Sequence, residues 1–250
     1  MTRESAPTLR YSRHLVLPDF GAAGQERLAR STVLLVGLGG LGSPAALYLA
    51  AAGIGRLLLN DFDRVDLSNL QRQVLYTEAD LGTAKTTAAA AALAALNPDC
   101  RLEALDGRLE GEALSMAVQR ADAVLDGSDN FGTRFAVNAA CVEAKKPLVS
   151  GAAIRYEGQL VVFDARDLAS PCYACLYGEN DEELENCRQN GVLAPLTGVI
   201  GSLMAVEAIK LLAGTGKPLL GRLLRYDAQS GELRSTPFEK DPACSVCSHP

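Results

Sequence analysis

The chain has 250 residues, 48% hydrophobic and 22% charged, a length and composition that suit a soluble globular protein with a buried core. Its formal net charge of −6 and its lack of a basic run argue against nucleic-acid binding, because a polyphosphate backbone recruits clustered Lys and Arg. The first residues also lack the apolar core and cleavage site of a secretory signal, so we expect a cytoplasmic protein.

A polar, basic arm precedes the first predicted element. The hydrophobic pattern of the amino-terminal third then predicts a helix at residues 19–30, a buried strand at 32–36, a helix at 41–52 and a second strand at 56–60. No charged residue occurs from position 31 to 55, a stretch long enough to span a bilayer. It contains six glycines and a proline, however, so a strand, a glycine turn and an alanine-rich helix explain it better. We therefore expect no membrane span.

A glycine-rich turn joins the first strand to the following helix and fits the pattern G-x-G-x-x-G with Gly37, Gly39 and Gly42, with Gly40 between them. Such a turn brings the backbone close to phosphate, and the helix start offers free N–H groups to an anion. Asp61, at the end of the second strand, is placed to accept hydrogen bonds from ribose hydroxyls. A purely structural turn, an NAD or FAD site and an ATP site all remain compatible with this pattern.

A dense polar run occupies residues 61–73, directly after the second strand. Arg72 offers a planar, positively charged guanidinium group, and Asn69 and Gln73 add neutral hydrogen-bond donors. The run therefore suits the binding of a triphosphate. Lys85 opens a predicted helix at 84–96 and would add a point charge. The alternatives are a solvated loop and an ordinary surface lysine.

Strands at 101–105, 123–125 and 148–150 alternate with helices at 112–119 and 131–144, which predicts a doubly wound, mostly parallel sheet. The segment 125–130 ends a strand at the carboxyl edge of this sheet, where open α/β sheets bind ligands. A carboxylate in this segment can hold Mg²⁺, since this ion keeps few protein ligands and shares the rest with phosphate. The alternative is an Asp that caps the next helix.

The composition changes after Gly151. Strands at 159–163, 222–227 and 232–235 predict a smaller, partly antiparallel extension, with a polar loop at 179–190 and a long apolar helix at about 197–212. We expect a single domain over 1–250, with a nucleotide-binding core at 31–150 and a second part at 151–250.

Two C-x-x-C pairs lie in the second part, Cys172 with Cys175 and Cys244 with Cys247. Four thiolates at these spacings suit one tetrahedral Zn²⁺ with no position open for catalysis, so we expect a structural zinc that holds the C-terminal tail. Of the other cysteines, Cys100 and Cys141 are expected to be packing residues, and Cys187 lies in the polar loop.

Several long motifs resemble one family over nearly the whole chain: RYSRH at 10–14, GLGGLG at 37–42, DLSNLQRQ at 66–73, SDN at 128–130, SGAAIRYEGQ at 150–159 and APLTGVIGSLMAVEAIK at 194–210. Together with Lys85 they resemble the ubiquitin-activating-type adenylyltransferases, in particular the members that serve molybdopterin and thiazole synthesis.

The resemblance implies an MgATP site formed by Gly37, Gly39, Gly40, Gly42, Asp61, Asp63, Ser68, Asn69, Leu70, Gln71, Arg72, Gln73, Lys85, Asp129 and Asn130. It also implies a homodimer, in which Arg13 reaches the nucleotide of the other subunit. Arg13, Arg72, Lys85 and Asp129 are then the candidate catalytic residues. The alternative for Arg13 is an ordinary residue of a disordered arm.

The implied reaction is ATP-dependent adenylation of the C-terminal glycine of a ubiquitin-like sulfur-carrier protein ending in Gly-Gly. The molybdopterin-synthase small subunit is the first candidate and the thiamine-pathway carrier the second, and residues 151–250 would bind the carrier. Cys187 would take part in thiol chemistry in some members. Because the chain stops soon after Cys247, we expect a separate sulfurtransferase. A flavin or nicotinamide oxidoreductase and a non-catalytic zinc module explain fewer of these residues.

Overall fold

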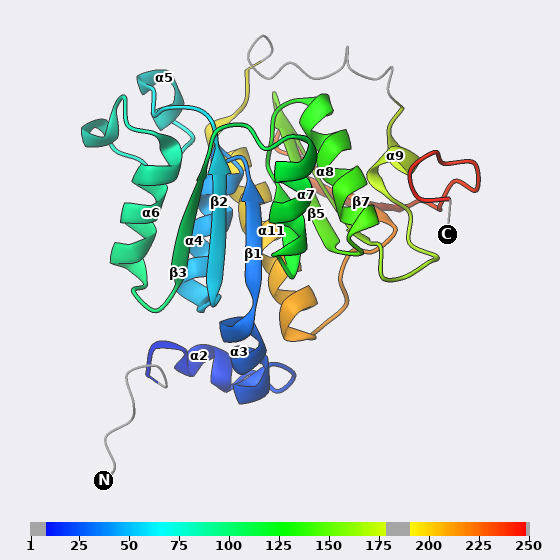
Figure 1. Cartoon of the computed structure of the whole chain (residues 1–250), viewed down its shortest axis with the longest axis horizontal. Coiled ribbons are helices and arrows are strands. Elements are labelled where there is room, and N and C mark those ends of the chain that lie inside the picture. Colours follow the sequence, from blue (N-terminus) through cyan, green and yellow to red (C-terminus); the bar gives the residue numbers. More distant parts are fainter. Residues whose placement is uncertain (1–8, 179–190, 249–250) are drawn as a thin grey trace.

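The computed structural model describes residues 9–178 and 191–248 and has an α/β fold built on one sheet (Figure 1). Cys187 and the polar loop at 179–190 therefore lie outside the described residues. The eight strands follow the order β3-β2-β1-β4-β5-β6-β7-β8. Their bounds are β1 Thr32–Val36, β2 Arg56–Asp61, β3 Arg101–Asp106, β4 Ala123–Asp126, β5 Pro147–Ile154, β6 Glu157–Asp164, β7 Arg222–Asp227 and β8 Glu232–Pro237.

The five strands from β3 to β5 pair in parallel, and β5 to β8 pair in antiparallel fashion. This confirms the predicted doubly wound sheet with an antiparallel extension. The central strands are mostly apolar, and β1 and β4 are almost fully buried, as expected for strands covered on both faces.

Helices cover both faces of the sheet (Figure 1). Behind the sheet in this view lie α4 (Gly42–Ala52), α6 (Lys85–Leu96) and α11 (Ala194–Ala213), which share one apolar core with that face. In front lie α7 (Gly111–Gln119) and α8 (Phe131–Glu143), which close a second core. The strand ends between the two layers are therefore held firmly from both sides.

Among the described residues, α11 is the one helix with the length and apolar composition of a membrane span. Half of its most apolar 18-residue window is buried inside the structure, as in the core helix of a globular protein. The uncharged stretch at 31–55 forms β1, the glycine turn and α4, as the sequence predicted.

The N-terminal segment lies beneath the amino ends of the strands (Figure 1). It contains the short helix α2 (Ser12–Leu15) where the sequence predicted only an arm, followed by α3 (Gly21–Arg30). Tyr11 helps to fix this segment, because its hydroxyl accepts a hydrogen bond from Asn97 Nδ2 at 2.9 Å. A single helical turn shows too little periodicity to be predicted from sequence.

The second part continues the same sheet. β5 and β6 are longer than predicted and form a hairpin in which Ile154 pairs with Glu157, so the change of composition after Gly151 falls inside a strand. Three further short elements were not predicted: α5 (Leu67–Leu70), the 3₁₀ turn η1 (Glu78–Asp80) and α9 (Tyr173–Leu176). Two of these position site residues, as described next.

Candidate active site and metal centre

A pocket of about 620 Å³ opens at the carboxyl ends of β1, β2 and β4. The strand order reverses between β1 and β4, and this is where doubly wound sheets bind their ligands. Two walls enclose the pocket: the β2 wall, formed by Lys85 and most residues between 61 and 73, and the β4 wall, formed by residues 127–130 with Arg134 and directly preceded in the chain by the buried Asp126. The glycine turn lies between the walls.

The glycines of the turn differ in what surrounds them. Gly37 has a φ of +86°, and a Cβ on Gly42 would lie 1.9 Å from the carbonyl oxygen of Gly37. A Cβ on Gly40 would press on Thr197 at 3.1 Å, whereas one on Gly39 would meet only Gln73 Nε2, at 3.6 Å. Gly37 and Gly42 thus shape the turn itself, and Gly39 faces the pocket.

A buried ion cluster lies at the end of β2. Lys85, only 3% exposed, places Nζ 3.1 Å from Asp63 Oδ2 and 3.8 Å from Asp61 Oδ2. Asp61 also accepts hydrogen bonds from the backbone N–H groups of Leu38 and Asp63, both at 2.8 Å. Burial raises the pKa of the Asp61 carboxyl, and the Lys85 charge opposes that rise. Each carboxylate oxygen of Asp61 keeps a lone pair for a further donor.

The short helix α5 positions the arginine of the β2 wall. Asp66 caps this helix by accepting a hydrogen bond from Ser68 N at 2.8 Å. Arg72 then donates from Nη2 to Asn69 Oδ1 at 2.8 Å and from Nη1 to Ser68 O at 3.3 Å. The guanidinium is thereby held beside the pocket in a defined orientation. Gln73 is buried, and its Oε1 has no hydrogen-bond partner among the described residues.

The β4 wall contains buried polar atoms that the described residues leave unpaired, namely Asp126 Oδ2 and Ser128 Oγ. Asp126 is 1% exposed, and burial raises its pKa while the positive charge of Arg134 lowers it. Asp129 is exposed at the pocket and Asn130 caps α8 by accepting from Thr133 N at 2.9 Å. Unpaired buried oxygens beside a pocket are expected where a ligand or ion completes the hydrogen bonding.

Most predicted nucleotide-binding residues line this one pocket: Gly37, Gly39, Gly40, Asp61, Asp63, Ser68, Asn69, Gln71, Arg72, Gln73, Lys85, Asp129 and Asn130. Gly42 lies beneath the turn, and Leu70 packs against the apolar core instead. Sequence reasoning missed Arg134, Thr197 and Asp126. The available signal for Arg134 was a charged residue on the otherwise apolar inner face of the predicted helix at 131–144.

Arg13 lies apart from the pocket of its own chain. It is exposed on α2, beneath the opposite ends of the strands (Figure 1). There it lines a separate hollow of about 310 Å³ between the N-terminal segment, α4 and α11.

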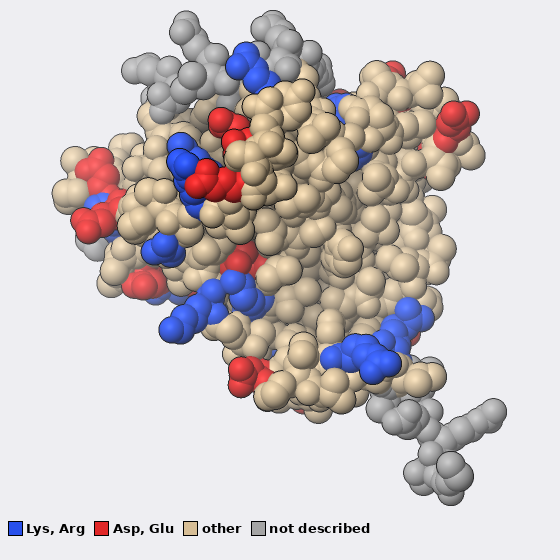
Figure 2. Space-filling model, turned by 180° about the vertical axis from the view of Figure 1, so that it is seen from behind, with Lys and Arg blue, Asp and Glu red and all other residues tan. Residues whose placement is uncertain are grey.

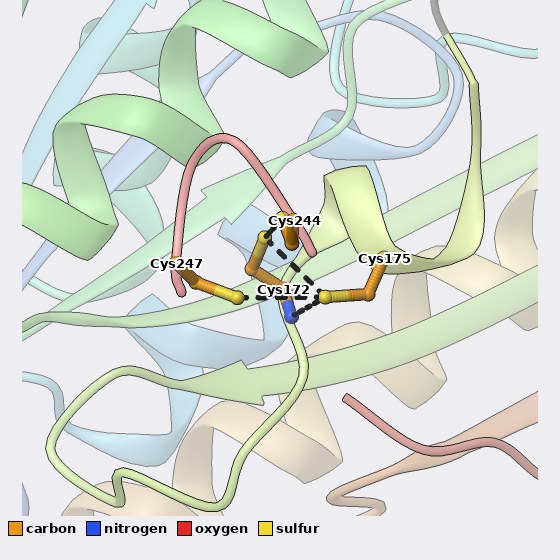
Figure 3. A group of neighbouring side chains, drawn as sticks. All are labelled: Cys172, Cys175, Cys244 and Cys247. Atoms are coloured by element: carbon orange, nitrogen blue, oxygen red, sulfur yellow. Dashed lines mark hydrogen bonds between the residues drawn. The ribbon is translucent and has the colours of Figure 1, made fainter. Parts of the chain in front are cut away.

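The four cysteines of the two C-x-x-C pairs converge at the end of the antiparallel extension (Figure 3). Their sulfur atoms all lie within 4.8 Å of one another, with separations of 3.7 Å for Cys172–Cys244, 4.0 Å for Cys172–Cys175 and 3.4 Å for Cys175–Cys247. Four sulfurs at about 2.3 Å from a tetrahedral Zn²⁺ are about 3.8 Å apart. The cluster therefore fits zinc, as the spacing predicted. Cys100 and Cys141 are buried, and burial raises the pKa of Cys100 to about 11, so neither is an activated thiol.

A doubly wound sheet with a glycine turn and a polar pocket at its switch point defines the class of α/β nucleotide-binding proteins. Within this class, residues 11–246 match the model of the ThiF family, and the chain belongs to that family.

Named relatives refine this assignment. The chain is 48% identical over 239 residues to Escherichia coli K12 sulfur carrier protein ThiS adenylyltransferase, covering 96% of this chain and 94% of that protein. It is also 48% identical over 239 residues to molybdopterin-synthase adenylyltransferase of the same strain, covering 96% of each. The solved structure of E. coli MccB with ATP aligns with a TM-score of 0.83 at 26% identity, covering 96% of this chain and 75% of that one. The chain is therefore an adenylyltransferase, which confirms the predicted enzyme class.

Proposed function

We propose that this enzyme uses ATP to adenylate the C-terminal glycine carboxylate of a ubiquitin-like sulfur carrier and releases pyrophosphate. The observation that carries this proposal is the single pocket that combines the glycine turn with Lys85, Arg72 and Arg134. Its volume is in the range of pockets that hold ligands of nucleotide size.

The pocket offers partners for the ribose and the phosphates of ATP. The turn at Gly39 is open enough for phosphate to approach the backbone, and α4 begins directly after the turn, so the positive end of its dipole favours an anion there. Asp61 is positioned for ribose hydroxyls. Arg72 and Lys85 supply positive charge for the triphosphate.

The reaction brings two anions together, because the carrier's carboxylate attacks the α-phosphorus of ATP. The carboxylate is already ionised at neutral pH and needs no general base. The protein's task is therefore to hold both reactants in line and to stabilise charge that develops in the transition state. Arg72 and Lys85 are our candidates for this stabilisation, since hydrogen bonds and ion pairs already orient both side chains.

Asp129 would hold Mg²⁺, which when bound neutralises phosphate charge. Its exposed carboxylate and the unpaired Asp126 Oδ2 provide oxygen ligands of the kind that this ion prefers, directly or through water. We assign the four cysteines to one structural Zn²⁺, with no open position for catalysis.

We further propose a homodimer in which Arg13 completes the partner's active site. The outer face of α4 and α11 supports this, because it exposes Tyr48 (58%), Val199 (40%) and Val206 (48%). Figure 2 shows the side of the molecule that bears these helices, where most charged side chains lie on the left and near the lower edge and a broad uncharged area extends from the middle to the right. An apolar face of this kind is typical of a subunit interface, and the hollow that contains Arg13 adjoins it.

Two carriers are candidates, because the relatives named for ThiS and for molybdopterin synthase are equally similar to this chain. We take the molybdopterin-synthase small subunit as the first and the thiamine-pathway carrier as the second. In both cases residues 151–250 would bind the carrier, and a separate sulfurtransferase would supply the sulfur. A nicotinamide oxidoreductase shares the glycine turn and Asp61 but gives no role to the pair of Arg72 and Lys85.

The test is to incubate the enzyme with MgATP and each carrier in turn and to look for the acyl-adenylate by intact-protein mass spectrometry. We expect the carrier's mass to increase by one AMP unit, with pyrophosphate exchange that depends on the same carrier. A carrier lacking its last glycine is the matched control and should show neither. Absence of the adenylate on both carriers, with tight binding of NAD instead of ATP, would reject the proposal.

A further inference from the structure

Asn138 on α8 contacts the cysteine site and is 1% exposed. Its Oδ1 accepts a hydrogen bond from the backbone N–H of Tyr173 at 2.8 Å, and its Nδ2 lies 3.5 Å from Cys172 Sγ, within the range of an N–H···S hydrogen bond. Because a backbone N–H can only donate, the oxygen of the amide must face Tyr173 and the nitrogen must face the sulfur. The orientation of this side chain is therefore fixed by the protein.

An N–H group aimed at a metal-bound thiolate has a defined physical effect. It stabilises the negative charge of the sulfur and fixes the direction of the ligand, and loss of such an outer contact commonly costs about 10-fold to 100-fold in metal affinity. The same amide also holds the first residue of α9, the helix that contains Cys175. Asn138 thus contacts one cysteine, Cys172, and the start of the helix that carries the other, Cys175.

The same helix reaches the nucleotide pocket one turn earlier. Arg134 lies four residues before Asn138, and side chains at this spacing lie on one face of a helix. Arg134 is buried, lines the pocket and donates from Nη2 to the carbonyl oxygen of Ser128 at 2.9 Å. It thereby holds the loop that presents Asp129. A rigid helix of 13 residues consequently contacts the cysteine site and the β4 wall through side chains one turn apart.

We propose that Asn138 is a positioning residue through which the metal at the four cysteines and the nucleotide in the pocket stabilise the same placement of α8. Each ligand then raises the affinity for the other, because coupling between two binding sites is reciprocal. The inference rests on the proposed binding of ATP and zinc, and it adds a link between the two sites. The physical element of the link is α8 with its two buried polar side chains.

The experiment measures zinc release from the purified enzyme to a chromogenic chelator, with and without saturating MgATP. For the wild-type protein we expect MgATP to slow release about 5-fold or more, the lower end of typical coupling. In Asn138→Asp the acceptor for Tyr173 is kept, but a carboxylate replaces the donor to Cys172. We expect zinc release to be about 10-fold to 100-fold faster, with little further effect of MgATP.

The matched control is Asn97→Asp, which changes another fully buried Asn whose amide donates to Tyr11 and Ala50, away from the cysteines. It should release zinc at the wild-type rate, even if it unfolds at a lower temperature. If Asn138→Asp does not fold, Asn138→Ser replaces it; its hydroxyl is too short to reach either the sulfur or Tyr173 N, so both contacts are lost, and zinc release should again be faster than in Asn97→Asp.

Two outcomes would overturn the proposal. Wild-type zinc release in the folded Asn138 variant would remove its role toward the metal. Identical release with and without MgATP, in wild-type protein shown by calorimetry to bind ATP, would remove the link to the pocket. A protein that does not bind ATP at all would reject the proposed function, and the comparison of the Asn138 and Asn97 variants would still decide the role at the cysteines.

Discussion

The two walls of the pocket differ in how their polar groups are satisfied. On the β2 wall the charged side chains are paired, as Lys85 is with Asp63 at 3.1 Å and Arg72 is with Asn69 at 2.8 Å, and the neutral Gln73 Oε1 is the buried atom that the described residues leave without a partner there. On the β4 wall Asp126 Oδ2 and Ser128 Oγ are buried without a partner among the described residues. The charged groups of the β2 wall are therefore preorganised, whereas the β4 wall obtains its remaining contacts from what it binds.

A substitution in the glycine turn between the walls is expected to have the largest effect on stability and tests this comparison. Gly42→Ala places a methyl group 1.9 Å from the carbonyl oxygen of Gly37, so backbone must move. The gain in helix propensity from Gly to Ala is about 1 kcal/mol, far less than the cost of displacing a packed turn. We expect a loss of about 3 kcal/mol or more in the free energy of unfolding, measured by urea denaturation.

Gly39→Ala is the control for the Gly42 variant. Its added methyl group meets only Gln73 Nε2, at 3.6 Å, so folding should be nearly unchanged. Since this methyl group enters the space where phosphate would approach, ATP affinity should still fall in calorimetry. Equal stability of the two variants would show that the turn is not fixed by the contact between Gly37 and Gly42.

Arg72→Ala tests the preorganised wall directly. Its guanidinium is already oriented by Asn69 and Ser68, and removing one preorganised cationic contact typically lowers a rate about 100-fold to 1,000-fold. We expect a decrease of this size in carrier-dependent pyrophosphate exchange, with normal folding. Arg64→Ala is the matched control, because Arg64 is an exposed arginine of the same polar run that bonds to Gly82 O and does not line the pocket. Equal rates in both variants would remove Arg72 from the mechanism.

The sequence predicted the β2 wall well and the β4 wall only in part. Residues 61–73 are contiguous and directly follow a strand, so their convergence at the sheet edge follows from topology alone. Lys85 joins them because α6 lies in the connection between the parallel strands β2 and β3, so its first residue is at the same edge of the sheet as the end of β2. Asp126 and Arg134 were missed, since one reads as the end of a buried strand and the other as part of an amphipathic helix. Only tertiary packing reveals that both are buried beside the pocket.

The cysteine site shows the same contrast at longer range. The C-x-x-C spacing predicted the ligands, but Cys172 and Cys244 are 72 residues apart, and nothing local indicates that Asn138 lies between them and the pocket. Long strands were also underestimated: β5 was predicted at 148–150 and extends over Pro147–Ile154. Gly151 and the alanines there weaken the β-propensity of a strand that tertiary packing nevertheless stabilises.

Asp126→Asn is expected to have the smallest effect. It tests the β4 wall through the pH dependence of the free energy of unfolding. Burial raises the pKa of Asp126, so the folded protein holds this proton more tightly than the unfolded chain does. The wild-type free energy of unfolding therefore falls as the pH rises from about 4, the usual pKa of Asp, through the raised pKa of the folded state. Asparagine keeps the shape of the side chain but cannot ionise, and it removes this loss.

We therefore expect Asp126→Asn to be more stable than the wild type by about 1 kcal/mol at pH 7 and to match it near pH 4, as measured by urea denaturation without ligand. Addition of MgATP should reverse the order at pH 7, because the variant lacks a carboxylate that the bound cation would stabilise. A variant that is less stable than the wild type at pH 7 without ligand would mean that the Asp126 carboxylate is fully satisfied within the fold. The β4 wall would then be as preorganised as the β2 wall, and the contrast between the two walls would be lost.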